Sequence, residues 1–286
     1  MKTFIISDID SHSESIIPYG LNMGKYTETE VEILHIIDPR KKQGVSSPYA
    51  DSRTVSPGNK LSHKRILQRE ENKASFALEK LLSAEASRLN YPLKINVEVK
   101  SDGVEKGISS AVDTDPEPLL VASLDPVNSM ITSLDELITI VGKVDSPGLF
   151  VPPAYKFRQP GNILIFTDFD DAAYEHLRDV MKWLHPFSPM INALGMAKKK
   201  DFMDMELKSS AWKKVVEKFL EPTLTLKTTI INKDGEKDPL LDYIQRNDPE
   251  LVLLPKRLLA SGLKKIIKPG KQGKILKSFG KPVMIY

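Results

Sequence analysis

One strand-and-turn motif occurs twice in this chain of 286 residues, at the start and again near the middle. Residues 2–10 align without a gap on residues 162–170, and the alignment superposes four apolar residues. Each copy then places a hydroxyl residue before an acid, which is Asp8 in the first copy and Asp168 in the second. A polar step at the carboxyl end of a buried strand is where an open α/β sheet places its ligand crevice. The sequence therefore predicts one α/β unit written twice.

The composition narrows the class of protein. The length is sufficient for two domains, each with its own core. Acids and bases nearly cancel at a net charge of +3, so we expect no nucleic-acid or membrane partner. The absence of cysteine excludes disulfides and thiolate chemistry. No signal peptide precedes the first acids, and no apolar run approaches the roughly 18 residues of a membrane span, which predicts a soluble, cytoplasmic protein.

Strand and helix patterns alternate through both halves, which favours mainly parallel sheets with helical crossovers. In the first half we expect strands at 3–7, 31–37, 93–99, 119–122 and 148–151, and helices at 14–25, 63–89, 103–112 and 129–141. In the second half we expect strands at 163–166, 190–196, 223–231, 251–254 and 283–286, and helices at 172–184, 209–220 and 239–246.

Two segments interrupt this alternation. Residues 39–61 are rich in Pro, Ser, Gly and charge, which predicts a long loop and a candidate contact element for a protein partner. Residues 153–161 have the Pro and Gly content of a linker. The predicted domains are therefore 1–152 and 162–286.

The order of these motifs resembles the universal stress protein family in its tandem two-domain form. The opening strands end in Ser7-Asp8 and Thr167-Asp168-Phe169, the second strand reads EILHIID, and the chain closes with DPELVLLP and KPVMIY. The resemblance implies two Rossmann-like domains, each a five-stranded parallel sheet of order 3-2-1-4-5. It also implies that residues 148–151 pair with 283–286 as an internal pseudo-dimer, which can itself form a homodimer.

The family's nucleotide-binding members suggest where ATP or AMP would bind. In the second half the matching positions are Asp168, Met196, Lys256, Arg257 and Gly270. The family's glycine-rich phosphate loop is not preserved, because Pro255 and Leu258 stand where its first two glycines belong. We therefore expect a binding or regulatory protein of the stress response, with weak or absent adenine-nucleotide binding and no enzymatic activity.

The equivalent site in the first half has lost more of the pattern. Asp8 is the matching acid, but Ser123 and Pro126 occupy the glycine positions, and Asp125 would repel a phosphate. This site is interpreted as degenerate.

Other interpretations of the same residues remain open. Asp8 and Asp168 could each cap the helix that follows, and the basic residues after 255 could form a solvated surface. The Asp-x-Asp pairs also resemble the nucleophile motif of Mg²⁺-dependent haloacid dehalogenase-like phosphatases, although the third motif residue is missing in both copies. The histidines show no metal-ligand spacing.

Overall fold

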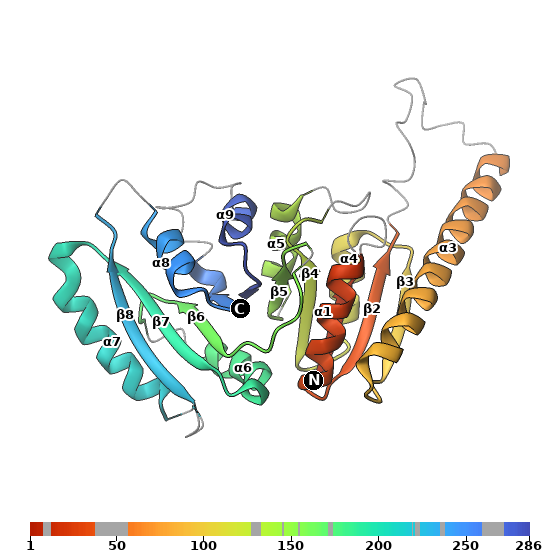
Figure 1. Cartoon of the computed structure of the whole chain (residues 1–286). Coiled ribbons are helices and arrows are strands. Elements are labelled where there is room, and N and C mark those ends of the chain that lie inside the picture. The colour runs from red at the N-terminus through yellow and green to blue at the C-terminus, as the bar shows by residue number, and fades with distance from the viewer. Residues whose placement is uncertain are drawn as a thin grey trace. The chain divides into compact units, whose positions relative to one another are not determined.

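Buried strands form the centres of two units in the computed structural model, Met1–Ser146 and Pro147–Tyr286 (Figure 1). The structure describes residues 1–7, 13–37, 57–126, 133–144, 146–153, 155–170, 174–218, 220, 224–234, 238–258 and 272–286.

Four parallel strands make up the sheet of the first unit. They are β1 (Lys2–Ile6), β2 (Glu30–Ile36), β3 (Ile95–Lys100) and β4 (Pro118–Ser123). Their spatial order is β3-β2-β1-β4, with Ile5 of β1 opposite both Ile33 and Val121. Strands β1 and β4 are almost completely buried, which explains their continuous apolar sequences.

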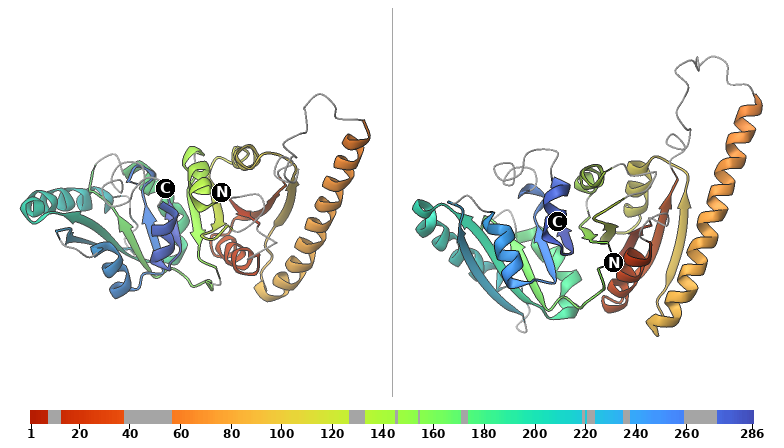
Figure 2. Two further views of the ribbon diagram at one scale, coloured as in Figure 1. Left: turned by 90° about the horizontal axis from the view of Figure 1, so that it is seen from above. Right: turned by 45° about the horizontal axis from the view of Figure 1, so that its top comes forward.

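Helices cover both faces of this sheet. They are α1 (Ser13–Tyr26), α3 (Pro57–Leu89), α4 (Val104–Val112) and α5 (Leu134–Lys143). Figure 2 shows α1 and α3 on one face and α4 and α5 on the other. The helix predicted from residue 129 begins later, because the Ser133 hydroxyl accepts a hydrogen bond from the Glu136 N–H (3.1 Å) as its N-cap.

The long loop predicted at 39–61 is wrong at its end, because α3 starts at Pro57. A proline suits the first turn of a helix, where its missing N–H needs no partner. Residues 39–56 lie outside the described residues, so the protein-binding role suggested for the loop stays a prediction.

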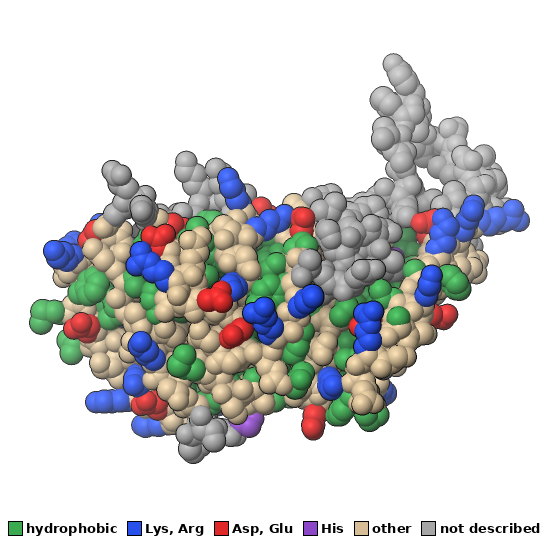
Figure 3. Space-filling view, viewed as in Figure 1, with side chains coloured by type: hydrophobic (Ala, Val, Ile, Leu, Met, Phe, Trp, Pro, Cys, Tyr) green, Lys and Arg blue, Asp and Glu red, His purple; other side chains and the backbone are tan. Residues whose placement is uncertain are grey.

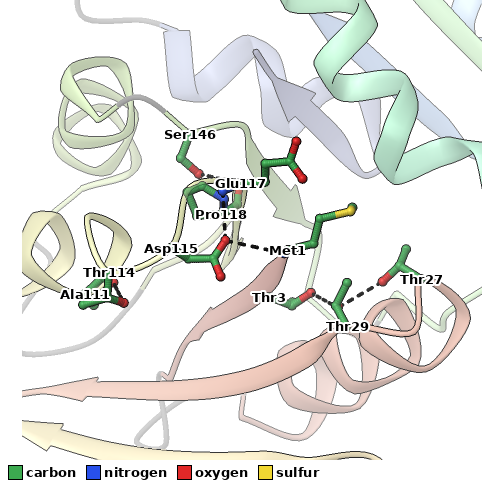
Figure 4. Close-up of polar contacts among 10 residues, drawn as sticks. All are labelled: Met1, Thr3, Thr27, Thr29, Ala111, Thr114, Asp115, Glu117, Pro118 and Ser146. Carbon is green, nitrogen blue, oxygen red and sulfur yellow. Dashed lines mark hydrogen bonds and ion pairs between the residues drawn. The ribbon is translucent and has the colours of Figure 1, made fainter.

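Polar contacts join the amino ends of the strands in the first unit (Figure 4). The Thr3 hydroxyl lies 2.9 Å from that of Thr29, which in turn lies 3.1 Å from the Thr27 hydroxyl. The α-amino group of Met1 lies 3.7 Å from the Asp115 carboxylate. These contacts satisfy polar groups at the end of the sheet opposite to the predicted ligand crevice.

Six strands form the sheet of the second unit. They are β5 (Gly148–Val151), β6 (Asn162–Phe166), β7 (Met190–Ala197), β8 (Thr225–Asn232), β9 (Leu251–Leu254) and β10 (Val283–Ile285). The order β10-β9-β6-β7-β8 is parallel throughout and corresponds to the predicted 5-4-1-2-3.

Strand β5 pairs with β10 in antiparallel register, Phe150 opposite Val283 and Gly148 opposite Ile285. The expected pairing of these two strands is therefore present. It places β5 in the second unit, so the units divide at Ser146, before the predicted boundary at residue 152.

Four helices cover this second sheet. They are α6 (Tyr174–Leu184), α7 (Phe202–Val216), α8 (Pro239–Asn247) and α9 (Gln272–Phe279), with short 3-10 turns η2 (His185–Phe187) and η3 (Lys199–Asp201). Helix α7 begins earlier than the predicted Ser209, since η3 leads straight into it. The structure thus has the mixed α/β architecture that the alternation predicted.

Substitution of two helical glycines by alanine should change the stability of the first unit in opposite directions. A Cβ at Gly24 in α1 would lie 2.3 Å from Val31 Cγ2 in β2, whereas a Cβ at Gly142 in α5 would meet nothing within 4 Å. Gly24→Ala should destabilise by about 1–3 kcal/mol through overpacking. Gly142→Ala should stabilise by up to about 1 kcal/mol through helix propensity. Urea unfolding of both variants measures the difference, and equal effects would contradict the packing of α1 on β2.

Candidate functional site

The turn after β6 has an unusual backbone conformation at Phe169. This residue has φ of 57°, in the left-handed region that side-chain-bearing residues rarely adopt. Two local hydrogen bonds support the turn. The Thr167 hydroxyl accepts from the Phe169 N–H (3.0 Å), and the Asp168 carboxylate accepts from the Asp170 N–H (3.3 Å). The turn therefore holds Asp168 and Asp170 on either side of Phe169.

Burial of the Phe169 ring explains why this conformation is stable. The side chain is 3% exposed and makes an edge contact with Trp212 of α7, with ring centroids 5.5 Å apart. A Cβ at Gly195 of β7 would lie 2.4 Å from the Phe169 ring, so this position requires glycine. The left-handed backbone costs about 1–2 kcal/mol, which burial of a phenylalanine side chain offsets with about 1.5–3 kcal/mol.

A single arginine contacts both acids of this turn. Arg257 follows β9 and forms ion pairs through Nη2 with Asp168 and through Nη1 with Asp170, the latter at 3.1 Å. Strands β6 and β9 are parallel neighbours with Ile165 opposite Leu253, so the residues just beyond both strands meet at one edge of the sheet. The Arg257 and Asp168 side chains are 30% and 40% exposed, which leaves the pair accessible to solvent and moderate in strength.

Tyr286 lies buried beside this ion pair. Its N–H donates to the Leu254 carbonyl (3.0 Å), which extends the strand pairing of β10. Burial raises the pKa of the Tyr286 hydroxyl well above its ordinary value, Arg257 opposes this shift and Asp168 adds to it. The phenol therefore stays neutral and adds no charge to the site.

The backbone after β9 offers few donors to a phosphate. Pro255 has no N–H, the Lys256 N–H donates to the Tyr286 carbonyl, and the Leu258 N–H donates to the Pro255 carbonyl (2.9 Å). A phosphate loop needs free amides that point at the ligand. Up to Leu258, this segment therefore does not resemble an anion cradle.

The structure brings together some of the predicted residues. Asp168 and Arg257 are in contact, Lys256 precedes Arg257, and Met196 is a buried residue near the carboxyl end of β7. Asp8 and Gly270 lie outside the described residues.

Asp170 and Tyr286 belong to the site as well, although neither was among the predicted ligands. Asp170 could have been found from the repeated Asp-x-Asp, whereas nothing in the sequence singles out Tyr286. Helix α6 is described from Tyr174 onward and residues 171–173 lie outside the described residues, so the suggested capping role of Asp168 stays a prediction. Its carboxylate accepts from Arg257 and from the next turn amide.

In the first unit, the polar residues after β4 form a closed local turn. The Ser123 hydroxyl is buried and accepts from the Asp125 N–H (3.0 Å). Ser7 follows β1 and is also buried, and its hydroxyl makes no hydrogen bond within the described part of the chain.

The described parts of the chain contain neither a metal-binding cluster nor a membrane-spanning helix. Over the ranges that the structure describes, no group of three or more His, Asp or Glu side chains could hold a metal ion. In the same ranges, no helix combines the length and apolar character needed to cross a bilayer.

Solved structures with the same fold include universal stress proteins, whereas no family model and no curated protein matches the sequence. A universal stress protein from Archaeoglobus fulgidus DSM 4304 superposes with a TM-score of 0.56 at 13% identity, over 99% of this chain and 95% of that one. A putative universal stress protein from Pseudomonas aeruginosa UCBPP-PA14 gives 0.53 at 13% identity, over 99% and 92%. At this identity the likeness confirms the predicted fold.

The left-handed backbone of Phe169 predicts different stabilities for the alanine and the glycine variant at this position. Phe169→Ala removes the ring and keeps a Cβ in the left-handed region, whereas Phe169→Gly removes both. Both should destabilise by about 3–5 kcal/mol, but the glycine variant should be the more stable by about 1 kcal/mol. Urea unfolding measures this difference. At Phe4, a buried residue of β1, the alanine variant should instead be the more stable. The same ranking at both positions would contradict a backbone cost specific to Phe169.

Proposed function

We propose that this chain, which has the fold of universal stress proteins, is a tandem binding or regulatory protein of the stress response. Its second unit binds an adenine nucleotide weakly or not at all, and its first unit does not bind one. The solved universal stress proteins with the same fold support the general class. The state of Asp168 supports the weak affinity.

The contact between Asp168 and Arg257 carries this proposal. Asp168 is the acid that the resemblance assigns to the adenosine moiety, and its carboxylate already accepts a charge-assisted hydrogen bond from Arg257. An adenosine hydroxyl must therefore share this carboxylate with a guanidinium. The affinity that remains is reduced by the free energy needed to separate this ion pair.

The segment after β9 lowers the expected affinity for phosphates further. The Lys256 and Leu258 amides are used within the protein, and Pro255 has none. Within residues 255–258, a nucleotide would therefore rely on the side-chain charge of Lys256 and Arg257, which binds phosphate without the geometric fit of a backbone cradle.

The same ion pairs argue for binding over phosphatase chemistry. A nucleophilic aspartate needs a free carboxylate oxygen and a bound Mg²⁺ to balance the charge. In this protein the positive charge beside Asp168 and Asp170 comes from Arg257, which contacts both carboxylates. A protein partner at residues 39–61 is retained as a prediction from the sequence.

Removing the competing guanidinium should strengthen adenosine binding. We expect the unaltered protein to bind ATP and AMP more weakly than about 1 µM, which corresponds to about −8.2 kcal/mol. Arg257→Ala should raise the affinity for adenosine about fivefold, because an accessible ion pair contributes about 1 kcal/mol. Asp168→Asn should lower it. Isothermal titration calorimetry measures all three affinities.

Arg246→Ala provides a matched control, since this exposed arginine lies in the last turn of α8, near the opposite ends of the strands. It should leave adenosine binding unchanged. Submicromolar binding of ATP by the unaltered protein, or a loss of adenosine binding in Arg257→Ala, would show the proposal to be wrong.

A further inference from the structure

Helix α3 is much longer than the strand that it accompanies. Its 33 residues span about 50 Å, whereas the six residues of β3 span about 20 Å. The described side chains that α3 buries are Ala74, Leu78 and Leu89, all in its second half. Of the described side chains of α3, these three are therefore the ones that contribute to the buried core of the first unit.

The charges of α3 separate between its two sides. Glu70, Glu71 and Glu85 are only partly exposed and lie toward the protein, where Glu71 accepts from the Ser101 hydroxyl (2.5 Å) of the segment after β3. Exposed basic side chains lie on the other side. One of them, Lys73, also contacts Glu70 at 3.3 Å, a surface pair that contributes little.

The exposed bases form a narrow row around one aromatic residue. At about 100° per residue, a row of five side chains falls within a sector of about 80° of the helix surface. These residues, called the α3 stripe, are Arg65, Arg69, Lys73, Phe76 and Lys80, all exposed. Phe76 is 70% exposed and lies within the sector, between the directions of Arg65 and Arg69. The exposed acid Glu79 lies outside it. In Figure 3, Lys and Arg side chains gather along this helix.

We propose that the α3 stripe binds single-stranded nucleic acid. Four cations at intervals of about one or two helical turns suit a flexible chain of phosphates, and an exposed aromatic ring between them suits a base that is free to stack. Single strands present both groups at once. A duplex hides its base faces, so it would use the cations without Phe76.

A lipid surface suits the stripe less well. Helices that lie in a membrane interface carry a broad apolar face opposite their charges. The α3 stripe contains Phe76 as its one apolar member. An anionic membrane would therefore gain charge attraction but almost no buried apolar area.

This partner differs from the expectation drawn from composition. The net charge of +3 averages over the whole chain, and it gave no reason to expect a polyanion. A local field depends on where the charges lie, and the α3 stripe gathers exposed bases, whereas Glu79, the exposed acid among the described residues of α3, lies outside it. The stripe lies in the first unit, and this proposal is independent of nucleotide binding at Asp168.

Fluorescence anisotropy of a labelled single-stranded oligonucleotide of about 20 nucleotides, titrated with the full chain, tests the proposal. With four phosphate contacts, the logarithm of the affinity should fall with the logarithm of salt concentration at a slope of about −2.8. Phe76→Ala should weaken binding about fivefold or more. The double variant Arg69→Glu/Lys80→Glu should reduce the slope to about −1.4 or abolish binding.

The matched control is Lys200→Glu/Lys214→Glu, which changes the net charge equally at exposed positions of the second unit. It should keep the slope of the unaltered protein. All variants should retain the same circular dichroism spectrum, because the altered side chains are exposed. Equal losses in both double variants, tighter binding to duplex than to single strand, or binding to phosphatidylserine vesicles alone would each overturn the proposal.

Discussion

Apolar strands that are buried on both faces leave polar residues no place except the ends of the strands. In β6 and β9, every residue after the first of β6 is buried, and the first acid or base appears only after each strand ends. Because the strands are parallel, their carboxyl ends share one edge of the sheet. The meeting of Asp168 with Arg257 is a direct consequence of this burial.

The Phe169 ring then determines the geometry at that edge. Its contact with Trp212 and the absence of a side chain at Gly195 hold the backbone in a conformation that would otherwise be unfavourable. Backbone strain of this kind is retained where the surrounding packing outweighs it. Core packing and site geometry therefore depend on the same aromatic residue.

The arrangement of charges distinguishes the crevice after β6 from the α3 stripe. At the end of β6, the positive charge of Arg257 is already paired with two acids within the protein and is therefore less available to an anionic ligand. Along α3, Glu70, Glu71 and Glu85 are only partly exposed whereas the bases of the α3 stripe are exposed, so the stripe directs positive charge toward solvent. A nearly neutral chain can thus contain both a crevice whose arginine is paired with acids and a helix with exposed bases, since attraction of an anion depends on the local separation of charge.

The sequence by itself determined the alternation of strands and helices and the place of Asp168 at a strand end, which follow from local periodicity. The order of the strands in the second sheet was expected from the resemblance to universal stress proteins. Only the tertiary structure decided the rest. It assigned β5 to the second unit through its pairing with β10. It also brought Arg257 into ion pairs with Asp168 and Asp170, and it buried Tyr286 beside them. Each of these contacts joins residues far apart in the chain, and local sequence patterns carry no information about such partners.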